Sequence, residues 1–337
     1  MKAVGLTRYL PIDDPESLVD VELSDPVATG RDLLVRVKAV SVNPVDTKVR
    51  RPRPEVEPTP KVLGWDAAGV VEAVGDEVTM FRPGDEVWYA GDITRAGCHS
   101  ELHLVDERIV ALKPRSLDFA SAAAMPLTSL TVFEALFTRM GVDPDGGDRG
   151  RTLLIIGGAG GVGSIGIQAA KLAGLTVIAT ASRAETRAWC SSLGADHVVD
   201  HTRPLRDGIE SLGLGDVDLI LNASDTSRYW DACCDLIATQ GTICSIVSTT
   251  GPVDIQPLMA KSATFAWELM FTRARFRTSD MIEQHRILSL VAALVDAGTI
   301  RTTVTEVLRP IDAANLRIAH RQLEEGRMIG KLALEGW

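Results

Sequence analysis

The sequence predicts an α/β protein in which a doubly wound parallel sheet is joined to a smaller β-barrel domain. Strands alternate with helices from about residue 123 to 299, which is typical of a parallel sheet. Residues 1–122 instead show short alternating strands between turn signals, and β character returns over 300–337. We therefore expect one domain made of 1–122 and 300–337 and a second made of 123–299.

The composition is that of a soluble globular protein. Of 337 residues, 45% are hydrophobic and 24% are charged, and the net charge is −10. This acidity argues against a nucleic-acid partner and against an anionic membrane surface. We expect no membrane span and no signal peptide. The five cysteines form no C-x-x-C pair, which favours a reducing compartment and predicts a cytoplasmic protein.

The amino-terminal domain is predicted from short apolar-polar alternations. Strands are expected over 33–40, 68–74 and 86–89, separated by turn signals such as Arg82-Pro83-Gly84-Asp85. Proline removes a backbone donor, so the proline-rich segment 51–60 is expected to be an exposed loop.

Three polar residues alternate in the same domain. His99, Glu101 and His103 would share one face of a strand. A metal site is one interpretation of this pattern, but we interpret it as the solvated face of a strand.

A glycine-rich loop organises the second domain. The apolar run 153–157 has the composition of a buried parallel strand, and an apolar-periodic segment follows the loop. Between them, residues 158–163 match G-x-G-x-x-G. In this motif the first glycine, Gly158, makes a tight turn, the second admits a pyrophosphate to the backbone and the third lets the helix pack on the strand, which predicts a Rossmann dinucleotide site. The loop residues expected to contact the cofactor are Gly158, Ala159, Gly160, Gly161, Val162 and Gly163.

The rest of the chain continues this pattern. Strands are expected over 175–181, 197–200, 217–222, 241–248, 302–307 and 330–334, and helices over 185–193, 230–238, 280–297 and 313–325. The apolar segment 264–271 is expected to be an edge strand that a second subunit covers, which predicts a homodimer.

The end of the second Rossmann strand indicates which cofactor is bound. NAD-specific folds place an acidic residue there for the ribose hydroxyl, but this strand ends in Ser182 and Arg183, and Arg187 follows. A hydroxyl and guanidinium groups suit a 2′-phosphate, so we expect NADPH. The alternative is that these arginines are solvated surface charges.

Several segments together resemble the medium-chain dehydrogenase/reductase superfamily over nearly the whole chain. They are 41–46 (SVNPVD), 64–71 (GWDAAGVV), 81–87 (FRPGDEV), 157–168, 193–196 (LGAD) and the closing Gly330-Lys331. Within it, the chain is similar to the zinc-independent quinone oxidoreductases that include zeta-crystallin, a branch often labelled zinc-type alcohol dehydrogenase-like. The resemblance implies a GroES-like barrel domain and a Rossmann domain.

The chain departs from the zinc alcohol dehydrogenases of that superfamily. The positions matching their catalytic zinc ligands hold Asn43, Trp65 and, by approximate alignment, Leu127. An amide, an indole and an alkyl chain do not supply the donors that zinc needs, so we expect no metal.

The resemblance also implies site residues. We expect Asn43, Asp46 and Trp65 to act on the acceptor: Asn43 by hydrogen bonding to its carbonyl or to the ribose, and Trp65 as an apolar wall. Asp46 either orients its neighbours or caps a helix, and Trp65 is equally a core aromatic. Further expected cofactor contacts are Asn43, Thr131, His201, Asn222, Ile246, Val247, Phe271 and Lys331.

The expected function follows from a site without a Lewis acid. Such a site suits acceptors whose reduced form is a stabilised anion, so we expect NADPH-dependent, zinc-independent reduction of quinones or other α,β-unsaturated carbonyls. The alternatives are a reductase of reactive unsaturated aldehydes and a catalytically weak NADPH-binding sensor or structural protein.

Overall fold

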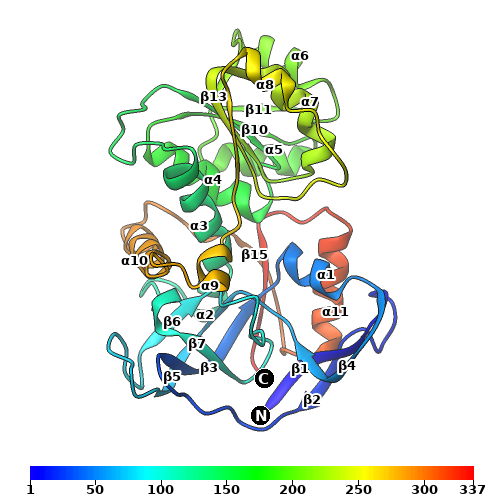
Figure 1. Cartoon of the computed structure of the whole chain (residues 1–337), viewed down its shortest axis with the longest axis vertical. Coiled ribbons are helices and arrows are strands. Elements are labelled where there is room, and N and C mark those ends of the chain that lie inside the picture. The colour runs from blue at the N-terminus through cyan, green and yellow to red at the C-terminus, as the bar shows by residue number, and fades with distance from the viewer. The chain divides into compact units, whose positions relative to one another are not determined.

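The computed structural model describes all residues, 1–337, and divides into two compact units (Figure 1). Unit 1 is made of Met1–Leu127 and Phe271–Trp337, and unit 2 of Thr128–Met270. The expected α/β class, with one β-rich and one doubly wound unit, is confirmed. The second boundary lies earlier than the expected 299/300, so residues 271–299 belong to unit 1.

The helix that follows this boundary explains the difference. Helix α10 (Glu283–Asp296) packs on β8 (Val110–Leu112) and on the preceding 3-10 turn. Asp296 accepts hydrogen bonds from the backbone of Ser116 at 2.9 Å and Arg115 at 3.1 Å. Because amphipathic periodicity shows that a helix has a buried face but not which sheet covers it, the sequence could not assign this helix.

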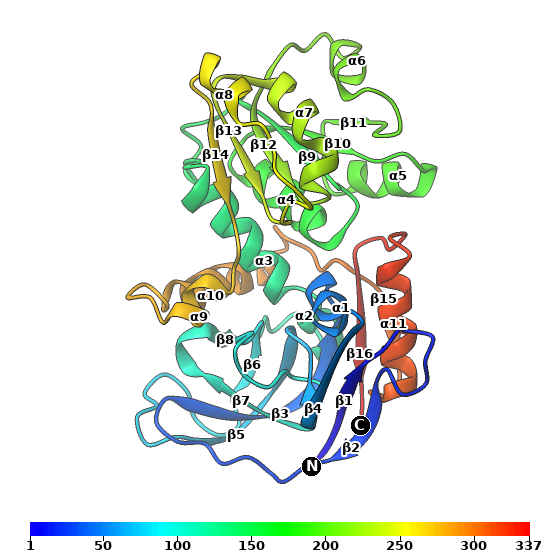
Figure 2. The same cartoon turned by 45° about the vertical axis from the view of Figure 1, so that its right-hand side comes forward.

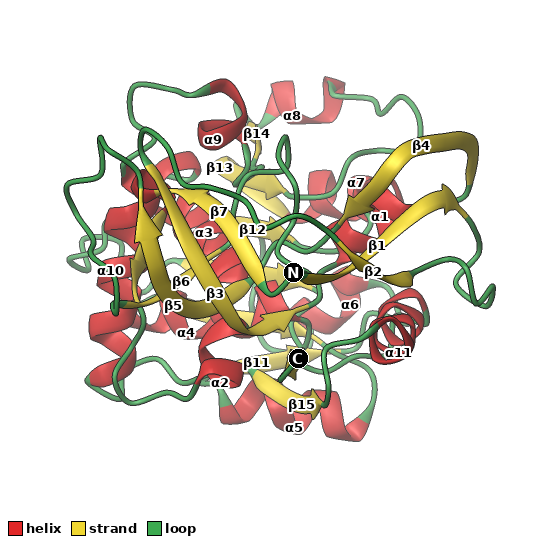
Figure 3. Cartoon of the chain, turned by 90° about the horizontal axis from the view of Figure 1, so that it is seen from below, coloured by secondary structure: helices red, strands yellow, loops and turns green.

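Unit 1 contains two sheets. A seven-stranded sheet has the order β15-β16-β3-β5-β6-β8, with β7 also paired to β3, and a three-stranded sheet has the order β2-β1-β4. Figure 3 shows the smaller sheet beside α1 and α11. The strands are β1 (Lys2–Tyr9), β2 (Val19–Glu22), β3 (Asp32–Ser41), β4 (Arg53–Val62), β5 (Ala67–Val74), β6 (Glu86–Tyr89), β7 (Leu102–Asp106), β8, β15 (Val304–Leu308) and β16 (Lys331–Glu335), and the helices are α1 (Pro44–Arg50), α2 (Phe119–Ala123), α9 (Thr272–Phe276), α10 and α11 (Ala313–Glu324).

The expected loop at 51–60 is wrong in this unit. Residues 53–62 form the edge strand β4, which pairs antiparallel with β1 through a shifted register. Proline is tolerated on an edge because the missing donor faces solvent, and the strand is mostly exposed as expected.

Unit 2 is a six-stranded parallel sheet with the order β11-β10-β9-β12-β13-β14, which can be followed in Figure 2. Numbered along the unit, this order is 3-2-1-4-5-6, the order of dinucleotide-binding folds, and the strand order reverses between β9 and β12. The elements are β9 (Thr152–Ile156), α4 (Gly161–Leu172), β10 (Thr176–Thr180), α5 (Ala184–Ser192), β11 (His197–Val199), α6 (Leu205–Glu210), β12 (Val217–Asn222), α7 (Thr226–Leu236), β13 (Ile237–Ser245), α8 (Gln256–Ala260) and β14 (Thr264–Trp267).

Both faces of this sheet are buried, which explains the unbroken apolar runs of its strands. On one face, Ile178 and Ile220 pack with Trp230 of α7 in the core. On the other, Ile155 and Leu221 lie close to Gly166 of α4, where an added Cβ would meet both at 3.4 Å.

A helical stretch over 119–139 corrects the expectation that no segment is long enough to span a membrane. By length and composition it qualifies, with a mean hydropathy of 1.3. However, 89% of its apolar window is buried inside the protein, as in the core helix of a soluble protein. It comprises α2, α3 (Pro126–Phe133) and a π-helical segment, Glu134–Arg139.

Candidate functional site

The glycine loop connects β9 to α4 in unit 2. Gly157 has φ +89°, so this glycine makes the tight turn that we assigned to Gly158. Gly158 has a different role: a Cβ there would lie 2.8 Å from the Cβ of Ala179 and 3.1 Å from the sulfur of Cys190. The loop therefore packs directly on β10, and Thr180 Oγ1 accepts from the Gly157 backbone at 2.9 Å.

The other two glycines of the fingerprint differ in what surrounds them. A Cβ at Gly163 would lie 2.3 Å from Gly157 O and 2.6 Å from Gly158 Cα, so this position needs glycine for the helix to pack on the loop. A Cβ at Gly160, the N-cap of α4, would meet no atom closer than Gly157 O at 3.5 Å. The space above Gly160 is open, and the first N–H groups of the helix have no partner within it, as an anion site requires.

Two unpartnered polar atoms lie at the carboxyl ends of neighbouring strands. Asn222 Nδ2 at the end of β12 and Ser245 Oγ at the end of β13 are buried without a hydrogen bond, and the two residues are paired in register. Buried polar groups are normally satisfied, so these atoms fit a ligand at the strand ends, where Rossmann folds bind dinucleotides. Asn222 is one of the expected cofactor contacts. Ser245 was not predicted, although it directly precedes Ile246 and Val247, which are expected contacts and are partly exposed.

Of the residues expected at the adenosine phosphate, some already have partners. Arg187 donates to Ala181 O at 3.2 Å and to Val198 O at 2.8 Å, so it ties the ends of β10 and β11 together. Arg183, the N-cap of α5, has its Nε 3.3 Å from Glu185 and is about two-fifths exposed. His201 Nδ1 lies 3.5 Å from the Tyr229 hydroxyl, a neighbour that the sequence did not indicate. Ser182 is partly exposed beside them, and Thr131 is buried in α3.

Unit 1 contains a buried ionic cluster around the side chain of Lys331. The Lys331 ammonium donates to Val42 O at 2.7 Å, to Asn43 Oδ1 at 2.7 Å and to Asp66 Oδ2 at 3.1 Å. Lys331 is 3% exposed and Asp66 is fully buried. Burial raises the pKa of Asp66, and the Lys331 charge opposes this shift. Because three acceptors surround it, the ammonium is held in one position.

The cluster also fixes Asn43. Its Nδ2 donates to Asp66 Oδ2 at 2.8 Å and to Trp65 O at 3.3 Å, while its Oδ1 accepts from Lys331. Both amide hydrogens are therefore in use. The expected hydrogen bond from Asn43 to an acceptor stays a prediction, and it would require the longer bond to Trp65 O to open.

Asp46 occupies the third position of helix α1 and completes a capping box with Asn43. Its Oδ2 accepts from the Asn43 backbone at 2.7 Å, so the expected capping role is present. Its Oδ1 is buried without a partner. Burial raises the pKa of Asp46 from 3.8 to about 7, a shift that the Asn43 hydrogen bond and Lys331 oppose.

Trp65 and Phe271 lie beside this cluster. Trp65 is 2% exposed and its Nε1 donates to Asp92 O at 3.4 Å. The two rings meet edge to face, with centroids 6.2 Å apart. Trp65 is thus part of the core, and its use as an apolar wall for a planar acceptor stays a prediction.

The residues at the positions that match zinc ligands in the resembled enzymes do lie close together. They surround the Asp66 carboxylate, which is already paired with Lys331. Asn43 Nδ2 and Leu127 N each donate to Asp66 at 2.8 Å, and Trp65 contributes only its backbone oxygen. These positions provide no thiolate or imidazole, and the Lys331 ammonium lies against the same carboxylate. A second cation would be repelled there, so this donor set does not fit zinc.

The alternating histidines are not a solvated face as we expected. His99 is fully buried and His103 is 6% exposed. His103 Nδ1 lies 3.0 Å from the Tyr89 hydroxyl and its Nε2 3.0 Å from Ala96 O. Burial lowers the pKa of His99 to about 3 and that of His103 to about 4, so both are neutral core residues at pH 7.

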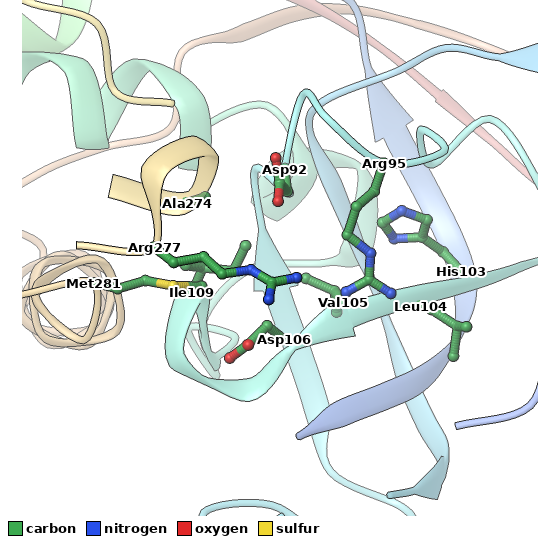
Figure 4. A pocket seen from close by; sticks show the side chains of 10 residues that line it. All are labelled: Asp92, Arg95, His103, Leu104, Val105, Asp106, Ile109, Ala274, Arg277 and Met281. Atoms are coloured by element: carbon green, nitrogen blue, oxygen red, sulfur yellow. The ribbon is translucent and has the colours of Figure 1, made fainter. Parts of the chain in front are cut away.

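A hollow in unit 1 lies near His103 and is lined by acidic and basic residues (Figure 4). Arg95 is held there by two hydrogen bonds to Asp32, at 2.7 and 2.8 Å. The cavity volume is about 20 Å³, which suits a water molecule rather than a substrate.

The raised pKa of Asp46 predicts a specific pH dependence of stability. The folded protein keeps the Asp46 proton up to about pH 7, whereas the unfolded chain releases it near pH 4. Its contribution to the free energy of unfolding is therefore full below about pH 4 and falls as the pH rises to 7, by at most about 1.4 kcal/mol per pH unit. Asp46→Asn keeps the acceptor oxygen and removes the titration.

Urea unfolding of both proteins between pH 4.5 and 7.5 measures this effect. The wild type should lose stability relative to Asp46→Asn as the pH rises. Buried His99 and His320, whose pKa values are lowered by burial, give the opposite slope in both proteins and cancel in the difference. A difference that does not change with pH would show that Asp46 is ionised throughout.

The fold and the glycine loop define the class of two-domain oxidoreductases that use a nicotinamide dinucleotide. Residues 29–115 match the family model described as alcohol dehydrogenase GroES-like domain, and residues 193–334 match that described as zinc-binding dehydrogenase. A zinc-type alcohol dehydrogenase-like protein from Staphylococcus epidermidis is 40% identical over 335 residues, 99% of each chain. The chain belongs to the medium-chain dehydrogenase/reductase superfamily, and the expected GroES-like domain is confirmed.

Solved structures and further relatives show the same fold and an oxidoreductase role. A Rhizobium etli protein named for the zinc-dependent alcohol dehydrogenases is 51% identical, with a TM-score of 0.95 over 100% of this chain and 98% of that one. A quinone oxidoreductase from Coxiella burnetii (26% identity, TM-score 0.81, 100% and 99%) and a mycobacterial protein complexed with NADPH (27%, 0.84, 100% of both) also match. A tomato 2-methylene-furan-3-one reductase is 37% identical over 214 residues, 60% of this chain and 53% of that protein.

Proposed function

We propose that this protein reduces quinones or other α,β-unsaturated carbonyls with NADPH, without zinc, in the cytoplasm. The observation that carries the proposal is the Lys331–Asp66 pair, to which Asn43 and Leu127, two of the residues at the expected zinc-ligand positions, donate hydrogen bonds. Relatives named as a quinone oxidoreductase and as a 2-methylene-furan-3-one reductase support the acceptor class, since the second name describes an α,β-unsaturated ketone.

The chemistry of the site favours acceptors that do not need a metal. Bound NADPH supplies a hydride. Without a Lewis acid, reduction is favoured where the acceptor's own conjugation spreads the negative charge that develops on oxygen, as in a quinone or an enone. Simple alcohols and aldehydes lack this conjugation and are expected to be poor substrates.

The chain's own residues would hold the acceptor side and a proton. Lys331 and Asp66 fix Asn43, and Trp65 with Phe271 supplies apolar surface for a planar ring. Below about pH 7 the Asp46 proton resides on Oδ1, since Oδ2 accepts the Asn43 backbone hydrogen. This neutral carboxyl adds no negative charge beside a developing anion.

The preference for NADPH rests on the absence of an acid at the end of β10, and Arg183 is the residue that tests it. Arg183→Glu is expected to raise the KM for NADPH about tenfold or more and to change that for NADH no more than about twofold, because only NADPH carries the 2′-phosphate. Arg187 is the poorer test, since its bonds to Ala181 and Val198 support the fold.

Steady-state kinetics with both cofactors measures this effect. The control is Arg149→Glu, which makes the same charge change before the amino end of β9. Equal effects of Arg183→Glu on the two cofactors would remove Arg183 from the phosphate site.

We also propose a homodimer through β14. This strand is the sheet edge, and Trp267 and Leu269 remain 48% and 46% exposed there. An exposed apolar edge favours pairing with a second copy. Light scattering should give twice the mass of the chain, and Trp267→Lys should shift the protein toward monomer; a monomeric wild type at micromolar concentration would contradict the dimer.

The test of the proposed function compares acceptors. NADPH oxidation should occur with a benzoquinone, a naphthoquinone or an enone, and oxidised cofactor with a primary alcohol should give no reaction. Turnover should survive dialysis against a chelator, and metal analysis should find no stoichiometric zinc. Tight NADPH binding without turnover of any acceptor would overturn the enzymatic proposal and favour a sensor.

A further inference from the structure

Unit 1 has a second, larger hollow at the carboxyl end of α1, the helix whose amino end is capped by Asn43. Its volume is about 260 Å³, and it is open to solvent. The lining residues are Thr47, Lys48, Arg51, Pro52 and Glu324. Helix α1 packs against α11, which contributes Glu324 (Figure 3).

The charges around this hollow are not balanced. Glu324 is ion-paired with the buried Arg50, which also donates to Leu10 O. Its charge is therefore already compensated. Lys48 and Arg51 form no ion pair, although the chain as a whole has a net charge of −10. Both residues are exposed, and burial of part of the Lys48 side chain, followed by the charge of Arg51, lowers the pKa of Lys48.

Helix α1 carries Lys48 of this hollow and, as its N-cap, Asn43 of the candidate active site. Lys48 follows Asn43 by five residues, about 7 Å along a helix axis.

We propose that Lys48 and Arg51 bind an anionic oxygen group, a carboxylate, sulfonate or phosphate, of a ligand of this enzyme. An anion between them would relieve their mutual repulsion, and arginine can bind such a group through two parallel hydrogen bonds. This inference deepens the proposed function, on which it rests for the reaction, and makes Lys48 and Arg51 specificity-determining residues. The anion is carried either by the acceptor or by the cofactor.

The experiment compares 1,4-naphthoquinone with 1,4-naphthoquinone-2-sulfonate in the wild type, Lys48→Gln, Arg51→Gln and the double variant. Each single change is expected to raise the KM for the sulfonate about tenfold and to leave that for the neutral quinone unchanged. Arg82→Gln, which removes an exposed arginine of unit 1, is the matched control. Calorimetric titration with the sulfonate measures binding without turnover.

The outcomes separate the two sources and the two proposals. If the NADPH dissociation constant rises instead of the sulfonate KM, the anion belongs to the cofactor and the site stands. If neither the sulfonate KM nor the NADPH dissociation constant changes in the folded variants, the inference is wrong, while turnover of the neutral quinone still supports the proposed function. If no quinone is reduced but the variants weaken sulfonate binding, the anion site stands and the proposed reaction is wrong.

Discussion

Gly160→Ala is expected to weaken NADPH binding by about thirtyfold or more and to lower the midpoint of thermal unfolding by no more than a few degrees. A methyl group at Gly160 would meet no protein atom closer than 3.5 Å, so the fold accepts it. The same methyl occupies the open space above the helix N-terminus, where a pyrophosphate would approach the backbone. Thirtyfold corresponds to about 2 kcal/mol of lost binding free energy.

A second glycine of the same loop provides the contrast. At Gly163 an added Cβ would lie 2.3 Å from Gly157 O and 2.6 Å from two Gly158 atoms, all of them backbone. Gly163→Ala is therefore expected to destabilise unit 2 by about 1–3 kcal/mol as well as to weaken binding. Gly160→Ala should therefore weaken NADPH binding and keep the fold, whereas Gly163→Ala should reduce both NADPH binding and stability.

Fluorescence titration with NADPH and thermal unfolding distinguish these variants. Gly215→Ala in the same unit, where an added Cβ meets nothing within 4 Å, controls for the loss of a glycine. Unchanged NADPH affinity in Gly160→Ala would mean that the dinucleotide does not bind at this loop.

The sequence predicted unit 2 well because its strands are buried on both faces. Burial on two sides requires continuous apolar runs, and β12 was predicted with the bounds that the structure has. Strand β4 was missed for the opposite reason, since an edge strand exposed on both faces keeps no apolar pattern and tolerates prolines. The tight turn was assigned to Gly158 instead of Gly157 because a motif gives spacing and not backbone angles.

The candidate site was predictable in its members but not in its contacts. Asp66 and Lys331 are separated by 265 residues, and the pairings of β16 with β3 and of β3 with β5 bring their segments together. Each is nevertheless visible in the sequence as a charge within an apolar run, in GWDAAGVV and in GKLALE. Because buried charges are rare unless they are paired, two such positions in one domain indicate that the two residues pair with each other. The pattern does not indicate that Asn43 uses its side-chain hydrogen bonds within the same cluster.

Lys331→Met is expected to destabilise the protein by about 3–5 kcal/mol, more than any other substitution considered for unit 1. The change removes the only cation that contacts Asp66 and leaves a fully buried carboxylate without its charge partner. It also frees Asn43 Oδ1 and Val42 O, which lose their buried donor. Asp66 is then expected to bind a proton at neutral pH, because the lysine charge that opposes its raised pKa is gone.

The double variant Lys331→Met/Asp66→Asn tests whether the pair acts as a unit. Asparagine retains an oxygen for the Leu127 N–H and carries no charge, so the double variant should recover at least half of the stability lost in Lys331→Met. Lys38→Met, at an exposed side chain of β3, is the control, with an expected change below about 0.5 kcal/mol. Urea unfolding at pH 7.5 gives these free energies. Additive losses in the double variant would show that the lysine and the carboxylate stabilise the protein independently, and the lysine would then not be the cation that takes the place of a metal.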